Sequence, residues 1–163
     1  MSACCGQGAK RELMRGLEKL LALDAIKTVF HRRIRYMDTK QWHLYAALHT
    51  ADAVTETYGD APPVIGSEAI AQAIETFMQD PKPITSVHHV HTPEINFTSE
   101  TTANGIWPME DRLWWSNDDR EEWLHGFGHY HEAYRKEGDN WLISHRRLTR
   151  LRVTMSEGFA HRH

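Results

Sequence analysis

The segments TANGIWPMEDRLWWS (residues 102–116) and EWLHGFGHYHEAYRK (residues 122–136) decide the fold, because polar and apolar residues alternate along both. Two flanking segments, residues 85–97 and 141–154, continue this period of two. The breaks between the four segments are short and rich in Asn, Asp, Gly, Ser and Glu. Short polar connections of this kind favour antiparallel neighbours. We therefore predict four antiparallel strands in the second half of the chain.

These predicted strands are longer than the usual length of about 5–6 residues, so we expect them to bend. Proline and glycine mark the places where a strand can bend or bulge. The candidate positions are Pro93, Pro108, Gly126 and Gly128. A strongly bent sheet has an interior on its concave side.

The first half of the chain has helical periodicity instead. Between Arg11 and Met37, apolar residues recur at steps of three and four and form one stripe. An earlier stripe of leucines is slightly out of register with this stripe near Asp24. The segment is therefore either two helices or one helix with a break. Further elements are predicted as a helix at 42–48, a short strand at 53–58 and a helix that begins at Ser67.

Helices followed by antiparallel strands indicate the α+β class. We expect a cone-shaped, strongly curved antiparallel sheet wrapped over the N-terminal helices. The length of 163 residues suits a single domain, which we place at residues 11–155. Residues 1–10 are expected to be a flexible N-terminus and residues 156–163 a C-terminal tail.

The composition argues against several classes of function. A net charge of −3 and a pI near 6.4 provide no basic field for nucleic acid or an anionic membrane. No apolar run is long enough to span a bilayer, and we expect no signal peptide. The cysteines, Cys4 and Cys5, are adjacent, so they cannot staple the fold or complete a zinc site. We expect a cytoplasmic protein that binds neither nucleic acid nor membrane.

Arg33 is a charged residue within the apolar stripe of the first predicted helix. A guanidinium that faces a core needs a carboxylate or a ligand anion as its partner. The alternative is that its long side chain reaches solvent at the edge of the stripe. The sequence leaves these alternatives open.

Asp111 shares one face of its predicted strand with Trp107, Met109, Leu113 and Trp115. Burial disfavours the charged form of a carboxyl group, so we expect Asp111 to be protonated and able to donate a hydrogen bond. The alternative is that this face points to water. The density of large apolar residues favours the buried position.

Histidine is abundant, at 12 residues, and His88, His89 and His91 crowd the start of one predicted strand. Histidine is the side chain best able to move protons near neutral pH. A histidine base needs a carboxylate to orient it, and Asp38 at the end of the first predicted helix is a candidate. Taken alone, each of these histidines is better explained as a hydrogen-bonded residue of the wall.

A metal site is a competing interpretation. The histidines at 88, 91, 129 and 131, together with Glu132, are suitable ligand types. His88 and His91, however, fall on opposite faces of a strand unless a bulge intervenes. Two leading helices are also atypical of small metal-binding β-barrels. We therefore rank metal binding second, and we expect no metal and no other cofactor.

Five segments in order along the chain are similar to one known group of proteins. They are IRYMDTKQWHLYAALHTADAV (34–54), VHHVHTPEI (87–95), GIWPMEDRLWW (105–115), GHYHEAYRKEGDNWLI (128–143) and RLTRLRV (147–153). They resemble the SnoaL-like branch of the nuclear transport factor 2-like superfamily. The resemblance implies a cone of curved sheet closed by helices around a deep pocket, assembled as a homodimer or homotrimer. The superfamily includes dehydratases, isomerases, cyclases and dehydrochlorinases, as well as proteins of no known activity.

Within that branch the chain most resembles the bile-acid 7-alpha-dehydratase type. The shared motif is H-x-x-H-x-P-E-I at residues 88–95, followed by a tryptophan-containing strand that reaches Glu-Asp at 110–111. The resemblance implies that Asp38 pairs with a catalytic histidine, His88. It also implies that Asp111 is a second pocket acid and that Arg150 is a pocket arginine.

One position departs from that type. The dehydratases carry a tyrosine five residues before the helix aspartate, and this chain has Arg33 there. Tyr36 is near in sequence but falls on another side of the helix. Because the phenol donor is missing, a substrate other than a bile acid is to be expected.

These observations predict cofactor-independent proton transfer in a hydrophobic pocket. His88, oriented by Asp38, would remove a proton next to a carbonyl group, and protonated Asp111 or Arg33 would stabilise the enolate or assist a leaving hydroxyl. The result would be loss of water or a double-bond shift in a polycyclic or aromatic hydroxy-ketone. The residues expected to bind this small hydrophobic substrate are Arg33, Arg150, Trp107, Met109, Tyr130, Tyr134 and His91. The alternative is a non-catalytic ligand-binding or assembly module on the same fold.

Overall fold

The structure is a computed structural model that describes residues 5–56, 62–79, 81–117 and 119–160. Within these ranges the helices are α1 (Cys5–Asp38), α2 (Trp42–Ala46), α3 (Ser67–Gln79) and α4 (Glu157–Ala160). The strands are β1 (His49–Thr55), β2 (Val64–Ile65), β3 (Thr85–Val90), β4 (Glu94–Phe97), β5 (Thr102–Asn117), β6 (Arg120–Glu137) and β7 (Asn140–Met155). Cys4 and the end of the strand predicted at 53–58 lie outside the described residues.

The strands form one curved sheet, which confirms the α+β class. The order is β2-β1-β7-β6-β5-β3, and β4 pairs with β5 beyond the end of β3. The pairs β3–β5, β5–β6 and β6–β7 are antiparallel as predicted, because short polar turns connect the long strands. The expectation of a fully antiparallel sheet is wrong at one pair, since β1 runs parallel to β7. No tight turn joins these two strands, so their direction is not constrained by a hairpin.

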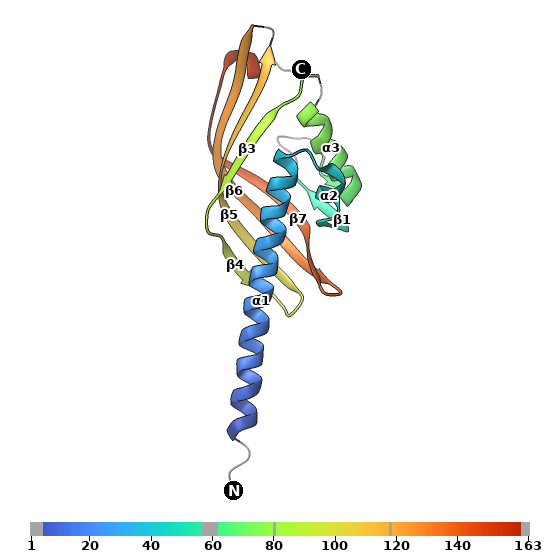
Figure 1. Ribbon diagram of the computed structural model, residues 1–163, viewed down its shortest axis with the longest axis vertical. Coiled ribbons are helices and arrows are strands. Elements are labelled where there is room, and N and C mark those ends of the chain that lie inside the picture. The colour runs from blue at the N-terminus through green and yellow to red at the C-terminus, as the bar shows by residue number, and fades with distance from the viewer. Residues whose placement is uncertain (1–4, 57–61, 80, 118, 161–163) are drawn as a thin grey trace.

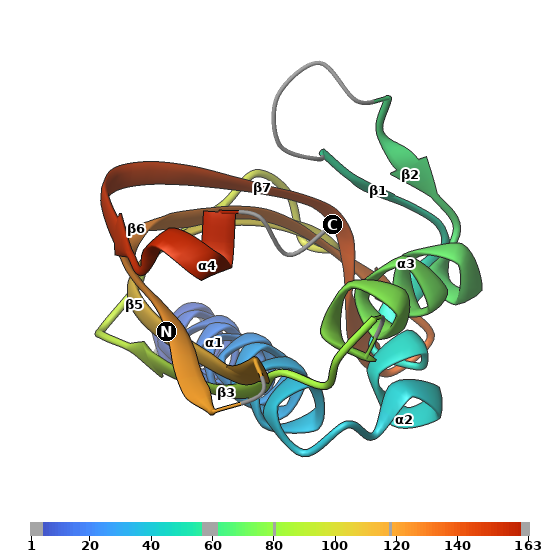
Figure 2. The ribbon, with the colours of Figure 1, turned by 90° about the horizontal axis from the view of Figure 1, so that it is seen from above.

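The long strands bend so that β3 and β7 face each other across the concave side of the sheet (Figure 2). The register of β6 and β7 shifts between Phe127 and Gly128, where Leu151 of β7 is the extra residue. The bulge is therefore on β7, opposite the predicted position Gly128. A second shift occurs at Ala133 and Tyr134. Pro108 is not a bulge, because the β5–β6 register is continuous through it. It lies opposite the gap between β3 and β4, and its carbonyl accepts the His91 backbone N–H at 3.0 Å.

Helix α1 is continuous from Cys5 to Asp38, so the break that was an alternative near Asp24 does not occur. The backbone of residues 5–10 is helical. The C-terminal half of α1 packs on the sheet, while its N-terminal half projects beyond the sheet (Figure 1). Leucines 17, 20 and 21 on the projecting part are accordingly exposed.

The core lies between α1 and the concave face of the sheet. Phe30 of α1 stacks on Trp107 of β5, with ring centroids 3.7 Å apart and planes 3° apart. A stacked aromatic pair of this kind contributes about 0.5–1.5 kcal/mol beyond the burial of its area. The remaining residues of the predicted stripe, Ile26, Val29, Ile34 and Met37, are also buried. The stripe therefore places α1 on the sheet and, through that packing, positions the end of the helix.

Within the segment expected to be a C-terminal tail, residues 157–160 form α4. Ser156 anchors this helix to β6, because its hydroxyl accepts the Trp123 backbone N–H at 2.9 Å. Phe159 packs on the cluster of Met78, Ile84, Leu113 and Trp115.

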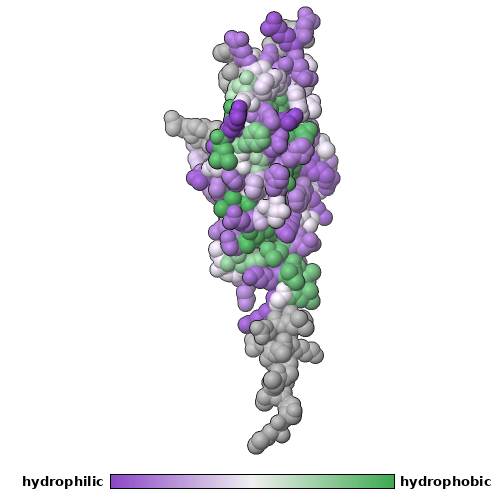
Figure 3. Space-filling model, turned by 90° about the vertical axis from the view of Figure 1, so that its left-hand side faces the viewer, coloured by the Kyte–Doolittle hydropathy of each residue, from purple (hydrophilic) through white to green (hydrophobic). Residues whose placement is uncertain are grey.

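The outer surface of the molecule is mixed in polarity. Polar and apolar residues intermingle on the side where the sheet lies, with no broad apolar face (Figure 3). Among the described helices, none combines the length and apolar character needed to cross a membrane.

Candidate active site

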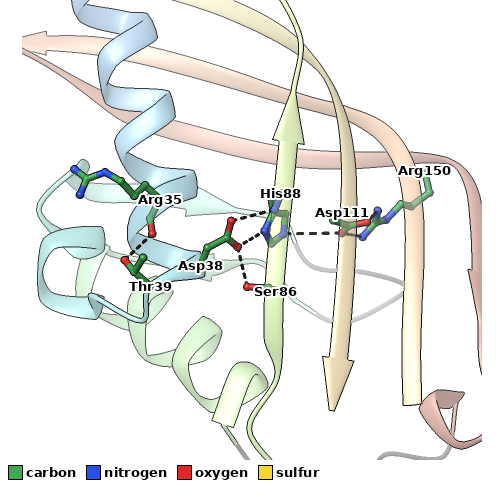
Figure 4. A network of polar contacts seen from close by, with 7 residues as sticks. All are labelled: Arg35, Asp38, Thr39, Ser86, His88, Asp111 and Arg150. Carbon is green, nitrogen blue, oxygen red and sulfur yellow. Dashed lines mark hydrogen bonds and ion pairs between the residues drawn. The ribbon is translucent and has the colours of Figure 1, made fainter. Parts of the chain in front are cut away.

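A row of residues across three strands forms the base of the candidate site. His88 of β3 lies directly opposite Asp111 of β5, and Asp111 lies opposite Gly126 of β6. Asp38, the last residue of α1, approaches His88 from the other side (Figure 4). The sheet register and the end of α1 together align Asp38, His88, Asp111 and Arg150, as the sequence predicted for the first three.

The position of Asp38 is set by the way α1 ends. Lys40 adopts a positive φ of 59°, and the backbone N–H groups of Lys40 and Gln41 donate to the carbonyls of Met37 and Tyr36. These bonds form a Schellman motif, which stops the helix just after Asp38. A carboxylate is unfavourable at this end of a helix, because the helix dipole is negative there. Its placement is therefore not explained by helix stability.

Hydrogen-bond donors of β3 compensate the charge of Asp38. The Asp38 Oδ1 atom accepts the Ser86 hydroxyl at 2.8 Å and contacts the His88 Nδ1 atom at 2.6 Å. The Asp38 Oδ2 atom accepts the backbone N–H of His88 at 3.0 Å. Because the carboxylate accepts, His88 carries its proton on Nδ1. The Nε2 atom of His88 is then the unprotonated nitrogen, and it is available as a base.

Asp111 is buried, as predicted, and it is paired with Arg150. The Arg150 guanidinium donates to both of its oxygens, each at 2.6 Å. A bidentate arginine contact of this kind favours the ionised carboxylate. Because both oxygens accept from Arg150, Asp111 does not donate a hydrogen bond in the structure, which differs from the donor role expected for it. The Oδ2 atom of Asp111 is 4.0 Å from the His88 Nε2 atom, so it lies close to that nitrogen without a hydrogen bond.

Gly126 makes room for this ion pair. A Cβ atom at position 126 would lie 2.3 Å from an Arg150 nitrogen and 2.4 Å from an Asp111 oxygen. No side chain fits at these distances while the ion pair stays in place. The glycine that looked like a bend position is thus also a requirement of the site.

The site opens into a cavity of about 470 Å³ between the concave face of the sheet and the helices α1, α3 and α4. His88, Asp111 and Arg150 line it together with mostly apolar side chains. The remaining lining residues are Met37, Thr55, Glu56, Val64, Ile70, Ala73, Ile74, Phe77, Met78, Leu113, Leu124, Tyr130, Arg146, Val153 and Phe159. Polar groups gathered at a few points of an apolar cavity are typical of a small-molecule site.

Only some of the predicted substrate-binding residues line this cavity. Arg150 and Tyr130 do. Met109 is buried beside the Arg150 guanidinium, with its sulfur 3.8 Å from the Nη1 atom. Trp107 and Tyr134 are buried in the core, where the indole N–H donates to the tyrosine hydroxyl at 2.9 Å. His91 is exposed beyond the end of β3.

Arg33 belongs to the core and is not a lining residue of the cavity. Its side chain is fully buried, with its Nε atom 3.1 Å from the Glu132 carboxylate. Burial disfavours the arginine charge, but the charge of Glu132 and the neighbouring tyrosines keep the pKa of Arg33 above its ordinary value. The Tyr134 hydroxyl donates to the same carboxylate at 2.8 Å. Of the alternatives that the sequence left open, the carboxylate partner is the one observed.

Arg146 and Thr55 are site residues that the sequence interpretation missed. Both are buried, and both line the cavity. Arg146 was detectable in principle, because it shares the inward face of β7 with Arg150 at a spacing of four. Thr55 had no such signal, since the parallel pairing of β1 with β7 places it here.

The competing metal site is not assembled. His131 bonds the Thr149 hydroxyl, whereas Glu132, the next residue, points to the opposite face and holds Arg33. In the described part of the chain, no three His, Cys, Asp or Glu side chains are grouped in a way that could hold a metal ion.

His49 provides a pH-dependent contribution to stability. Burial, and beyond it the charges of Arg33 and Arg146, lower its pKa from 6.5 to about 3, so the folded protein holds it neutral. Between these values the unfolded chain binds more protons, so stability is lost as the pH falls from 6.5 towards 3. We expect this group to cost about 2 kcal/mol between pH 7 and pH 5. Urea unfolding of the wild type and His49→Gln at both pH values measures it, and equal pH slopes would contradict it.

The comparisons with known proteins agree with this architecture. The curved sheet with helices on its concave side is the architecture of a nuclear transport factor 2-like protein. Residues 18–147 match the family described as SnoaL-like domain. The chain therefore belongs to the SnoaL-like family.

Several solved structures share the fold. A putative scytalone dehydratase from Novosphingobium aromaticivorans has a TM-score of 0.72 at 20% identity, over 84% of this chain and 89% of that one. The hexachlorocyclohexane dehydrochlorinase LinA-type3 from Novosphingobium barchaimii has a TM-score of 0.73 at 17% identity, over 88% and 95%. ActVI-ORFA from Streptomyces coelicolor has a TM-score of 0.67 at 15% identity, over 80% and 97%. At such low identities these similarities establish the fold alone.

Proposed function

We propose that the protein is a cofactor-independent dehydratase or isomerase that acts on an apolar hydroxy-ketone. His88 Nε2 takes a proton from the carbon next to the carbonyl, and the electrons of that C–H bond move to the carbonyl oxygen to form an enolate. For dehydration, the enolate re-forms the carbonyl, a C=C bond forms, and the β-hydroxyl leaves as water with the proton from His88. For isomerisation, His88 returns the proton to the γ-carbon of an unsaturated ketone.

The observation that carries the proposal is the Asp38–His88 pair at the cavity wall. The 2.6 Å contact at Nδ1 selects the tautomer in which Nε2 is the base. His88 lines the cavity while its side chain is only 5% exposed, so the base is held within a mostly apolar wall. A positioned base of this kind contributes about 10²–10⁴-fold to a rate.

The Asp111–Arg150 pair has a defined part in this mechanism. Asp111, 4.0 Å from Nε2, stabilises the positive charge that His88 acquires when it takes the proton. Arg150 holds that carboxylate in place and offers positive charge beside the developing enolate. These roles replace the predicted roles of protonated Asp111 and of Arg33, which is bound to Glu132 in the core.

The similar structures support an elimination reaction. Two of them are named as a putative scytalone dehydratase and a hexachlorocyclohexane dehydrochlorinase, and both names denote eliminations. Arg33 stands where the bile-acid dehydratases carry a phenol, which argues for a different substrate. The alternative, a binding module without chemistry, has no use for an oriented base at the cavity wall.

Hydrogen exchange tests the proposal without knowledge of the natural substrate. The protein is incubated in D₂O with 1-tetralone or a 3-oxo-steroid, and mass spectrometry follows deuterium entering the carbon next to the carbonyl. We expect exchange faster than in buffer alone for a ketone that binds. Binding of such a ketone, confirmed by calorimetry, without any acceleration would favour the binding module.

A further inference from the structure

Arg146 is a buried cation at the cavity wall that has no carboxylate partner among the residues that the structure describes. It is 6% exposed and lines the cavity. Its Nη1 group donates to the Tyr45 hydroxyl at 2.8 Å, and its Cζ atom lies 5.3 Å from the centre of the Tyr130 ring. Within the described ranges, no carboxylate lies within 4.0 Å of it. A buried charge without a counter-charge is costly, so its presence calls for a partner.

The charged neighbours of Arg146 do not neutralise it. The charge of Glu132 is balanced by Arg33, with which it forms an ion pair. The Arg33 guanidinium lies 4.5 Å from the same Tyr130 ring that Arg146 approaches. Asp111 is bound to Arg150. The Glu56 carboxylate forms its ion pairs with His145 at 3.0 Å and with Arg147 at 3.9 Å, and not with Arg146. Counted over the described residues, this end of the cavity therefore carries a net positive charge.

Two hydrogen-bonding groups at this end are also unused. The Arg146 Nε atom and the Thr55 hydroxyl are buried, and neither has a hydrogen-bond partner among the residues that the structure describes. Both residues line the cavity and are more than nine-tenths buried. A buried polar group without a partner costs about 1–3 kcal/mol, which a ligand acceptor would relieve.

We propose that Arg146, held by Tyr45 and with Thr55 beside it at the cavity wall, forms a subsite for a carboxylate or a similar monoanionic group of the substrate. This rests on the proposed function, because it narrows the substrate to an apolar hydroxy-ketone that carries an anion. Arg146 and Arg150 lie four residues apart on the inward face of β7, about 13 Å at roughly 3.3 Å per residue. The anion is thus held well away from the carbon that meets His88, and it fixes the substrate's direction in the cavity.

A matched pair of ligands tests the subsite by binding alone. The probes are 2-naphthylacetate and its neutral analogue 2-naphthylacetamide, with affinities measured by isothermal titration calorimetry at low salt. We expect the wild type to bind the acetate at least 10-fold more tightly than the amide, because each charge-assisted bond favours the anion. Equal affinities would overturn the subsite.

The variants localise the effect. Arg146→Gln is expected to remove the preference for the acetate, and Arg146→Lys to keep part of it. Arg152→Gln is the matched control, because Arg152 lies on the same strand but is exposed and does not line the cavity. It removes the same charge and is expected to preserve the preference. If Arg146→Gln keeps the wild-type preference, the subsite is overturned.

Two further measurements keep the test independent of folding and of catalysis. In the wild type, the NMR signal of the Arg146 Nε–H group is expected to shift with the acetate and not with the amide; no such difference would overturn the subsite. The His88→Asn variant is expected to keep the acetate preference. A retained preference without any hydrogen exchange by the wild type would refute the proposed function and leave the subsite standing. Hydrogen exchange by the wild type without any preference for the acetate would support the proposed function and overturn the subsite.

Discussion

Replacing His88 with asparagine is expected to lower the rate of ketone hydrogen exchange by about 10²–10⁴-fold, because it removes the base and leaves the cavity nearly unchanged. Asp38→Asn is expected to have an effect of similar size. Asp38 accepts from Ser86, from the His88 ring and from the His88 backbone, with both oxygens in use. An asparagine has one oxygen, so its NH₂ group must face one of these donors. The His88 ring then loses its tautomer or its orientation.

His89→Asn is the matched control for the first variant. His89 is the next residue on β3, and it lies exposed on the opposite face. The His89→Asn variant is expected to catalyse ketone hydrogen exchange at the wild-type rate. The ring nitrogen chemical shifts of His88 provide a second measurement, since they report which nitrogen carries the proton. A wild-type exchange rate in His88→Asn would remove the base from the mechanism.

The sequence predicted the long strands well because local chemistry determines them. Polar turns interrupt an alternating pattern at three places, and hairpins follow from such turns without knowledge of the rest of the chain. The parallel pairing of β1 with β7 could not be predicted in this way, because it joins segments that are distant in sequence. The continuity of α1 at Asp24 was likewise ambiguous, since an exposed stripe can change register without breaking a helix.

The sequence predicted which residues belong to the candidate site better than it predicted which side chains they contact. Asp111 interrupts an apolar strand face, His88 belongs to a histidine-rich strand, and Asp38 was the candidate carboxylate for it. The structure brings these three residues together. Their partners depend on register across the sheet. Asp111 meets Arg150 only because Gly126 leaves the space between them empty.

Arg33 is a second residue whose burial, but not its partner, could be predicted from the sequence. Its burial followed from the helical stripe, but its partner Glu132 lies on β6, 99 positions further along the chain. Which residue of β6 lies opposite α1 depends on how the whole sheet is placed against the helix. The sequence therefore could not decide whether the partner of Arg33 is a ligand anion or a protein carboxylate, and only the folded structure identifies Glu132 as that partner.

Glu132→Gln is expected to destabilise the folded protein by about 3–5 kcal/mol, because it leaves the Arg33 charge buried without a counter-charge. Both side chains are fully buried, so water cannot take over the role of the carboxylate. The new amide can still accept the Tyr134 hydroxyl, which currently donates to Glu132 at 2.8 Å. The loss is therefore assigned to the charge and not to that hydrogen bond. Urea unfolding followed by tryptophan fluorescence measures it.

The double variant Arg33→Met with Glu132→Gln separates a missing partner from a general defect of packing. Removal of both charges eliminates the unpaired cation, so most of the stability lost in the single variant is expected to return. The control is Asp52→Asn, which breaks the ion pair with Arg135 at the surface. That pair stays solvated, so the unfolding midpoint is expected to change little. A double variant as unstable as Glu132→Gln would mean that shape, and not charge, makes Arg33 and Glu132 necessary in this core.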